Sequence, residues 1–235
     1  MPRTRRCSDT QWMQRALDLA RGAQGLVWPN PPVGCVLVKD GRALAEAATY
    51  PGGRPHAERA AIEAAGEEAR GGTLYVTLEP CCHWGQTPPC TDAIISAGIA
   101  RVVCAMQDPD PRVNGGGFRR LGAAGVRLSV GLGADAAAKI MAGFLHRTRT
   151  GQPLVLTMEN ARTEIPRSCD GSLCTQGDGL WLQFRTKQGQ ERRRLSGDMP
   201  ELLALLGEWG LTMVAVPEDD PCLQAMPAVD LIRAE

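Results

Sequence analysis

Two short segments constrain the fold of this chain more than any other feature. The first is Pro55-His56-Ala57-Glu58, which opens a stretch of helical composition. The second runs from Cys81 to Cys90, between a buried strand predicted over 73–78 and a helix predicted over 90–97. Each segment therefore lies at the start of a predicted helix, next to a strand. This placement predicts that their side chains face one cavity at the edge of a sheet.

The residue types in these segments are those of a hydrolytic zinc site. One imidazole, from His56, and two thiolates, from Cys81 and Cys90, can hold Zn²⁺ and leave a fourth position for water. Glu58 stands two residues after the histidine, where its carboxylate can act as an acid and a base without binding the metal. The pattern H-x-E followed by P-C-x-x-C is typical of zinc nucleobase deaminases, but here eight residues separate the two cysteines.

Other protein classes would use the same residues differently. A purely structural zinc site would fill the fourth position with protein, and Cys82 and His83 are the nearby candidates. A catalytically inactive member of the fold would keep zinc for stability, but it would not need Glu58 as an acid and base. A deaminase that edits nucleic acid is disfavoured, because the chain has no net charge and few aromatic side chains.

Strands and helices alternate along the chain up to a predicted boundary near residues 148–152. Ser8 and Gln11 form a capping box before the first helix, and Asp40-Gly41 is typical of a hairpin turn. The alternation predicts a three-layer α/β/α sandwich over residues 1–149 and a small α+β domain over 150–235. Within these domains we expect one helix over 135–147, a polar stretch from 159 to 179, a hairpin around 187–190 and a helix over 200–209.

The amino-acid composition limits the classes of binding partner and the cellular compartment that we expect for this chain. The 26 basic and 26 acidic residues cancel, so no overall field attracts nucleic acid or an anionic membrane. No apolar run approaches the roughly 18 residues of a membrane-spanning helix, and the basic N-terminus lacks the apolar stretch of a signal peptide. Nine cysteines without secretory features favour reduced thiols and metal ligands. We therefore expect a cytoplasmic protein with a small-molecule substrate.

Residues 10–150 resemble the pyrimidine deaminase domain of the bifunctional riboflavin-biosynthesis deaminase–reductase family. The long spacing between the cysteines is specific to this branch of the deaminases. The resemblance implies a cytidine deaminase-like fold, zinc bound by His56, Cys81 and Cys90, and Glu58 as the proton shuttle. It also implies that the substrate is an aminopyrimidine related to a diaminopyrimidinone with a ribosylamino phosphate. The motifs that carry it are Pro29-Asn30-Pro31-Pro32-Val33-Gly34, Pro55-His56-Ala57-Glu58, Leu78-Glu79-Pro80-Cys81, Thr87-Pro88-Pro89-Cys90, Asp108-Pro109, Gly143-Phe144 and Arg147-Thr148-Arg149-Thr150-Gly151.

Four positions depart from that family. Gln86 stands where the family usually has a basic residue, Asp110 where it usually has Asn, Gly116 where a basic residue is common, and Thr49 where a histidine is usual. Two cations are lost and one carboxylate is gained, and these changes disfavour a phosphate. The substrate contacts expected from the resemblance are Asn30, Thr49, His83, Gln86, Asp108 and Asp110.

These departures allow two interpretations of the substrate tail. In the first, the tail differs from ribose phosphate, for example because it is dephosphorylated. In the second, the tail is unchanged and Arg54, Arg112 or Arg119 supplies the missing charge. The turnover of phosphorylated and dephosphorylated substrates distinguishes the two.

The segment from 150 to 235 resembles a shortened form of the family's NADPH-binding reductase. Where that domain has a Gly-Gly phosphate loop, this chain has Pro217-Glu218-Asp219-Asp220. Glycines let backbone N–H groups approach a pyrophosphate, whereas three acidic residues repel it. We therefore expect no cofactor in this segment and a role in packing or in a homodimer. Cys169, Cys174 and Cys222 are a weaker candidate for a second metal site.

Overall fold

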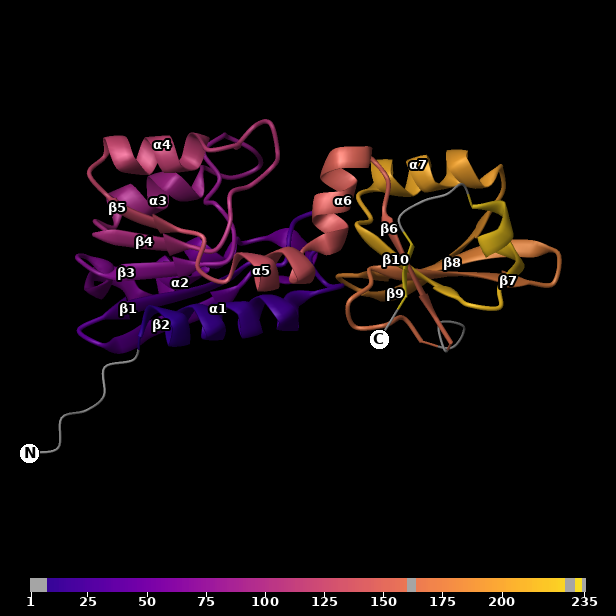
Figure 1. The fold of residues 1–235 in the computed structure, drawn as a ribbon, viewed down its shortest axis with the longest axis horizontal. Helices are drawn as coiled ribbons and strands as arrows, with labels where there is room; N and C mark the ends of the chain where they lie inside the picture. Colours follow the sequence, from indigo (N-terminus) through magenta and orange to yellow (C-terminus); the bar gives the residue numbers. More distant parts are fainter. Residues whose placement is uncertain (1–7, 160–163, 227–230, 234–235) are drawn as a thin grey trace, which may run out of the picture. The chain divides into compact units, whose positions relative to one another are not determined.

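The computed structural model describes residues 8–159, 164–226 and 231–233 and consists of two compact units, each with its own sheet (Figure 1). The first unit comprises Met1–Ala23, Pro32–Tyr50 and Arg54–Ile140. The second comprises Gln24–Pro31, Pro51–Gly53 and Met141–Glu235. Two short segments from the N-terminal part of the chain therefore belong to the second unit, which the sequence did not indicate.

The first unit contains a five-stranded mixed sheet with the order β2-β1-β3-β4-β5. Strand β1 is antiparallel to both β2 and β3, while β3, β4 and β5 run parallel. The parallel strands are joined by helices, as the alternating sequence pattern predicts. The elements are α1 (Asp9–Ala23), β1 (Gly34–Lys39), β2 (Arg42–Ala48), η1 (Pro51–Gly53, within the second unit), α2 (Ala57–Ala65), η2 (Gly66–Ala69), β3 (Thr73–Val76), α3 (Cys90–Ser96), β4 (Arg101–Cys104), α4 (Gly116–Ala123), β5 (Arg127–Val130) and α5 (Ala134–Ile140).

Helices cover both faces of this sheet. α2 and α4 both pack against α3, whereas α1 packs against α5 and against β1. Figure 1 shows α3 and α4 on one side of the strands and α1 on the other. The predicted three-layer α/β/α sandwich is therefore confirmed for this unit.

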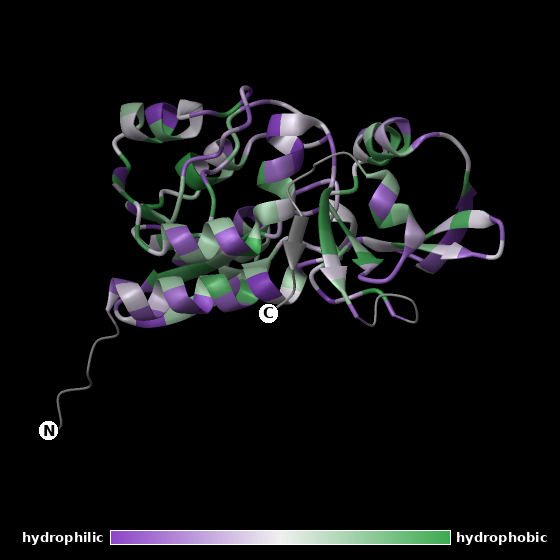
Figure 2. Cartoon of the chain, turned by 45° about the vertical axis from the view of Figure 1, so that its right-hand side comes forward, coloured by the Kyte–Doolittle hydropathy of each residue, from purple (hydrophilic) through white to green (hydrophobic). Residues whose placement is uncertain are grey.

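Local sequence signals explain how its first elements form. The backbone N–H of Ser8 donates to Gln11 Oε1 at 2.8 Å, and the N–H of Gln11 donates to Ser8 Oγ at 3.4 Å, so the predicted capping box is present. Hydrophilic and hydrophobic turns alternate along α1, the helix that follows the N-terminal trace in Figure 2. Asp40 (φ 52°) and Gly41 (φ 77°) make the predicted hairpin turn between β1 and β2.

Gly34 in β1 is required by the close approach of α1. A Cβ on Gly34 would lie 1.9 Å from the Ala16 carbonyl oxygen, whereas one on Gly22, in α1, would meet no atom within 4 Å. We expect Gly34→Ala to lower the free energy of unfolding by about 3 kcal/mol, because the backbones must separate. Gly22→Ala should leave it unchanged or raise it by up to about 1 kcal/mol, because alanine favours helix. Urea unfolding of both variants tests this prediction, and equal stabilities would contradict it.

The second unit contains a six-stranded mixed sheet with the order β11-β6-β10-β7-β8-β9. Strands β11, β6, β10 and β7 pair in parallel, and β7, β8 and β9 form an antiparallel meander that includes the predicted hairpin. Helix α7 buries Met199, Leu202, Leu203 and Leu206 in a core with strand residues such as Leu182. The elements are α6 (Ala142–Thr150), β6 (Leu154–Met158), β7 (Gly171–Gln176), β8 (Gly179–Thr186), β9 (Gly189–Leu195), α7 (Met199–Trp209), β10 (Met213–Pro217), η3 (Pro221–Ala225) and β11 (Leu231–Arg233).

Two sequence-based expectations are wrong in this region. The single helix expected over 135–147 is two helices, α5 and α6, because Met141 has non-helical angles (φ −99°, ψ 15°). The division between the compact units falls between Ile140 and Met141, and the sequence-based domain boundary near 148–152 stays a prediction. The polar stretch from 159 to 179 contains strand β7, which the sequence analysis missed. Its buried residues pair with both β10 and β8, so tertiary contacts outweigh its weak local signal.

Candidate metal centre and its surroundings

The structure brings the three predicted ligands together in the first unit. His56 is the N-cap residue of α2, and Cys90 is the first residue of α3. Cys81 follows the end of β3, and its sulfur accepts a hydrogen bond from the Cys90 backbone N–H at 3.3 Å. The thiol and imidazole groups therefore meet where two helices begin. Helix N-termini favour the thiolate form of cysteine.

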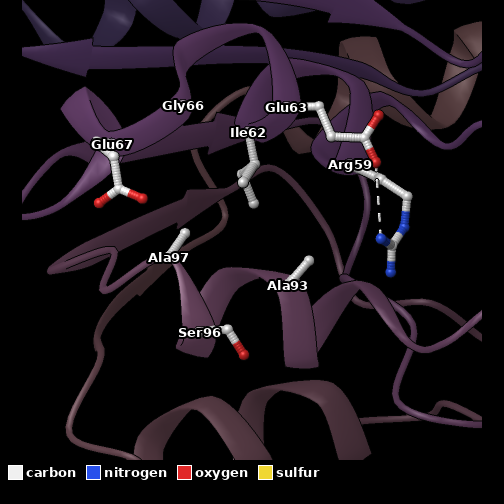
Figure 3. Close-up of a pocket in the computed structure, with 8 residues that line it drawn as sticks. All are labelled: Arg59, Ile62, Glu63, Gly66, Glu67, Ala93, Ser96 and Ala97. Carbon is white, nitrogen blue, oxygen red and sulfur yellow. Dashed lines mark ion pairs between the residues drawn. The ribbon is translucent and has the colours of Figure 1, made fainter.

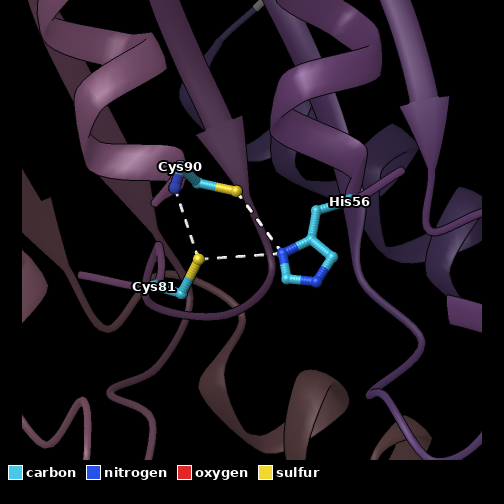
Figure 4. Close-up of side chains that lie close together, drawn as sticks. All are labelled: His56, Cys81 and Cys90. Atoms are coloured by element: carbon cyan, nitrogen blue, oxygen red, sulfur yellow. Dashed lines mark hydrogen bonds between the residues drawn. The ribbon is translucent and has the colours of Figure 1, made fainter. Parts of the chain in front are cut away.

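The distances between these ligands suit a tetrahedral zinc ion. Nδ1 of His56 lies 3.7 Å from Cys81 Sγ and 3.4 Å from Cys90 Sγ (Figure 4). A zinc ion with ordinary bond lengths to one nitrogen and one sulfur separates these two atoms by about 3.5 Å. The donor set therefore fits zinc without rearrangement, with Nδ1 as the metal-facing nitrogen.

The ionisation of the two thiols also suits metal binding. The pKa of Cys81 is lowered to about 4, chiefly by a hydrogen bond from Cys90 and then by one from His56, against the effect of burial. The pKa of Cys90 is raised, chiefly because its thiol donates to Cys81 and because it is buried. These hydrogen bonds therefore favour the thiolate form of Cys81, which is the form that binds zinc.

Glu58 lies in the first turn of α2 and is 4 % exposed. Burial raises its pKa to about 6, and the charges on His56 and Cys81 also act on it. The Glu58 carboxylate therefore interacts with the Cys90 thiol and with the charges of His56 and Cys81. In the described part of the chain, the cluster of potential metal ligands comprises His56, Cys81 and Cys90, without Glu58. The ligand cluster leaves Glu58 out, and the role of this carboxylate in proton transfer stays a prediction.

The two residues considered as a fourth ligand lie next to this cluster in sequence but are not part of it. The Cys82 thiol points to the Arg112 carbonyl oxygen at 3.7 Å, and a Cβ on Gly116 would lie 2.8 Å from Cys82 Sγ. His83 is half-buried, and its Nδ1 has no hydrogen-bond partner among the described residues. Cys169, Cys174 and Cys222 likewise form no ligand cluster within the described ranges.

Glu79 organises the loop that follows β4, a role that the sequence analysis missed. This buried carboxylate accepts backbone hydrogen bonds from Asp108 at 3.2 Å, Gly115 at 3.0 Å and Phe118 at 3.1 Å. It therefore fixes both ends of the loop that carries Asp108 and Asp110. The acidic residue directly before Pro80-Cys81 was the available signal, but its partners lie 29 to 39 residues further along the chain.

We expect Glu79→Gln to lower the free energy of unfolding by about 3 kcal/mol. The amide group places a donor where the carboxylate accepted, so that buried N–H groups lose their partners. Glu67→Gln, at an exposed acidic residue of η2, is the matched control and should change stability by less than about 0.5 kcal/mol. Urea unfolding measures both variants. Equal stabilities would show that Glu79 does not hold the loop.

Asp110 and Arg112 neutralise each other within this loop. The guanidinium Nε and Nη2 of Arg112 donate to Asp110 Oδ1 at 3.0 Å and Oδ2 at 2.5 Å, which lowers the pKa of Asp110. Asp108 is buried, and its burial raises its pKa to about 6. The Asp110 backbone N–H donates to Asp108 Oδ1 at 2.9 Å. The charge of Arg112 is therefore paired with that of Asp110.

The remaining predicted contacts have different surroundings. Gln86 is exposed near the tip of the loop between Cys81 and Cys90. Thr49 is buried, and its hydroxyl accepts a hydrogen bond from the Val33 backbone N–H at 3.1 Å. Asn30 belongs to the second unit, where its Nδ2 would lie 1.9 Å from a Cβ on Gly53. The roles of these residues in substrate binding stay predictions.

A separate hollow of about 310 Å³ lies between α2 and α3 (Figure 3). Arg59 and Glu63 form an ion pair of 3.7 Å on one side of it. The metal ligands and Glu58 are not among its lining residues. The hollow is therefore distinct from the metal centre. Its lining is Arg59, Ile62, Glu63, Gly66, Glu67, Ala93, Ser96 and Ala97.

Comparison with known proteins defines the class of this site. Residues 6–106 match the cytidine and deoxycytidylate deaminase zinc-binding region. This match agrees with the three ligands, the helix that carries Glu58 and the three-layer fold. Residues 6–106 therefore contain a zinc-binding region of the cytidine deaminase class, and zinc is the metal of this region.

Relatives across most of the chain define the family. The chain is 43 % identical to the riboflavin biosynthesis protein RibD of Haemophilus influenzae over 216 residues, which cover 92 % of this chain and 54 % of the relative. It is 47 % identical to RibD of Escherichia coli over 175 residues, 74 % of this chain and 46 % of the relative. The structure of Acinetobacter baumannii RibD has a TM-score of 0.72 at 26 % identity and matches 88 % of this chain and 80 % of that one. The chain belongs to the RibD family, and it spans about half the length of the curated relatives it matches.

A second solved structure, of an enzyme with two named activities, is also similar to this chain. It is the diaminohydroxyphosphoribosylaminopyrimidine deaminase and 5-amino-6-(5-phosphoribosylamino)uracil reductase of Thermotoga maritima. It has a TM-score of 0.71 at 28 % identity and matches 89 % of this chain and 80 % of that one. Within the described ranges, this chain has no helix whose length and apolarity would let it cross a bilayer.

Proposed function

We propose that this chain removes an exocyclic amino group, by hydrolysis, from an aminopyrimidine that resembles the diaminopyrimidinone of the riboflavin pathway. The observation that carries this proposal is the buried carboxylate of Glu58 beside the His56, Cys81 and Cys90 cluster. A structural zinc site needs no such carboxylate. The proposed reaction exchanges the amino group for an oxygen atom from water and releases ammonia.

The proposed mechanism assigns the proton transfers to Glu58. When bound, zinc supplies Lewis-acid chemistry that makes water a nucleophile near neutral pH. The Glu58 carboxylate accepts a proton from the attacking water and delivers it to the ring nitrogen. It then accepts the proton of the hydroxyl group formed at the ring carbon and transfers it to the departing amine, so that the C–N bond breaks, ammonia leaves and a carbonyl group remains. Because Glu58 is buried, bulk water competes little for these protons.

The tail of the substrate is proposed to differ from a ribose phosphate, for example by lacking the phosphate. Support comes from the exposed neutral side chain of Gln86 and from the pairing of Asp110 with Arg112. Thr49 supports it as well, because its hydroxyl is engaged by the Val33 backbone. The chain is therefore proposed to act in riboflavin-like or specialised metabolism.

The second unit is proposed to bind no NADPH and to serve in packing or in a homodimer. In the segment that replaces the Gly-Gly loop, the Asp220 carboxylate accepts hydrogen bonds from Thr175 N at 2.8 Å and Cys222 N at 3.0 Å. This acid takes up backbone donors of the kind that hold a pyrophosphate in a glycine-rich loop. We place the chain in the cytoplasm, because the eight cysteines in the described part are free thiols.

Ammonia release from a panel of aminopyrimidines, with and without a phosphate, tests the proposed function. The zinc-loaded chain should release ammonia from at least one member. Absence of release from every member would contradict the proposal and favour the alternative, a catalytically inactive subunit of the deaminase fold that uses zinc structurally.

A further inference from the structure

Arg54 is a half-buried cation on the rim of the metal centre. Its Nη1 donates to Thr87 Oγ1 at 2.5 Å, and a Cβ on Gly85 would lie 3.5 Å from its Nη2. Thr87 and Gly85 belong to the loop between the two zinc-ligand cysteines, and Arg54 itself stands two residues before His56. The guanidinium is therefore held against the metal-site loop by a neutral hydroxyl group.

Two other arginines near this loop have carboxylate partners that engage their charge. Arg112 is paired with Asp110 through three side-chain hydrogen bonds, and Arg120 lies 2.5 Å from Asp92 Oδ1. By contrast, no carboxylate in the described part of the chain forms an ion pair with Arg54.

Arg119 differs from Arg54 in its exposure. It lies over the glycines at 115 and 116 on α4, but its side chain is exposed to solvent. Hydration compensates an exposed charge, whereas a half-buried charge beside neutral groups lacks part of that compensation. Arg54 is therefore the cation at this rim that gains most from binding an anion.

The geometry also leaves Arg54 able to bind such a group. A guanidinium has five N–H donors in a planar fork, and Thr87 engages only one of its nitrogens. The remaining donors suit the paired oxygens of a phosphate or a carboxylate. Gln86, the neighbour of both Gly85 and Thr87, has no charge to contribute.

We infer that Arg54 binds an anionic group, a phosphate or a carboxylate, on the tail of the substrate. The cation at this rim thus comes from the segment before His56 and not from position 86. This inference rests on the proposed function. It refines the altered tail to one that keeps a negative charge and meets the protein at a new position.

Binding and turnover by the zinc-loaded full chain test the inference with three forms of one aminopyrimidine, whose tails end in a phosphate, a carboxylate or a hydroxyl group. Arg54→Met should weaken binding of an anionic form about tenfold or more in calorimetry and raise its KM similarly, with kcat nearly unchanged. The hydroxyl form should change less than about twofold. Whichever anionic form shows the larger loss identifies the group that Arg54 recognises.

Two further variants sharpen the test. Arg59→Met removes an arginine that also reaches this loop, at the Pro88 carbonyl oxygen, but whose charge is paired with Glu63. It should leave binding of all three forms unchanged. Gln86→Arg in the Arg54→Met background should restore part of the lost affinity, because it places a cation on the same loop.

Failure of the inference and failure of the proposed function have different signatures. If Arg54→Met weakens the three forms equally, or weakens none, the inference is wrong even though ammonia is released. If no form binds the wild-type chain, the inference is also wrong. If Arg54→Met weakens only an anionic form while no form is turned over, the inference holds and the proposed function fails.

Discussion

Replacing Glu58 with glutamine is expected to lower kcat for ammonia release about a thousandfold, while the zinc content stays at one ion per chain. Glutamine has nearly the same shape but cannot accept a proton from water or pass one to the leaving amine. The buried position of Glu58 beside the ligand cluster makes this loss specific to proton transfer. Steady-state ammonia release and metal analysis of the same preparation measure the two quantities.

Two further results decide how this loss is interpreted. Glu58→Ala should lose activity to a similar extent, since it also lacks the proton-accepting group. Glu63→Gln, at an exposed glutamate of the same helix, is the matched control and should keep full activity. If Glu58→Gln retained more than about a tenth of the wild-type kcat, Glu58 would not be the proton shuttle.

Replacing Cys90 with serine is expected to weaken zinc binding about a hundredfold or more and to abolish ammonia release. The serine hydroxyl stays protonated near neutral pH, so the site loses one of its two thiolate ligands. In wild-type protein, zinc binding should raise the unfolding temperature, because the metal stabilises the folded state. The variant should show little of this increase in a thermal unfolding experiment with added zinc.

Cys82→Ser is the control for this experiment. Cys82 is adjacent to Cys81 in sequence, but its thiol points to the Arg112 carbonyl oxygen instead of the ligand cluster. The variant should bind zinc like the wild-type chain. If Cys82→Ser lost zinc and Cys90→Ser kept it, the assigned ligand set would be wrong.

The metal centre could be predicted from the sequence because its chemistry depends on local signals. His56 and Cys90 each stand at the beginning of a helix, and Cys81 follows a strand of buried residues. The local amino-acid composition marks these helix and strand boundaries clearly. Residues that follow neighbouring strands at the same edge of a sheet lie close together. The sequence therefore predicts the same ligand cluster that the structure contains.

Other features depend on contacts between residues far apart in the sequence. The three backbone groups bound by Glu79 lie about 30 to 40 residues away, so no local pattern indicates its role. Strand β7 is polar in sequence and is stabilised by pairing with β8 and β10. The break at Met141 was missed because Met141 is not itself a helix breaker and the nearby Gly143 lies within α6.

The sequence also could not show which cations near the site are free. Arg54, Arg112 and Arg119 all qualified as sources of the missing positive charge. The structure distinguishes them, because Arg112 is held by Asp110, Arg119 is exposed, and Arg54 is half-buried and held by the neutral Thr87. The pairing between charged side chains therefore determines what Gln86 and Asp110, which depart from the family pattern, imply about the charge of the substrate tail.

Isotope transfer from water tests the proposed hydrolysis most directly. The zinc-loaded chain is incubated with an aminopyrimidine substrate in water enriched in oxygen-18, and the product is analysed by mass spectrometry. We predict one oxygen-18 atom in the pyrimidine product for each ammonia molecule released, in wild-type protein but not in Glu58→Gln. Ammonia release without oxygen-18 in the product, or equal incorporation by both proteins, would contradict hydrolytic deamination by Glu58 at this zinc centre.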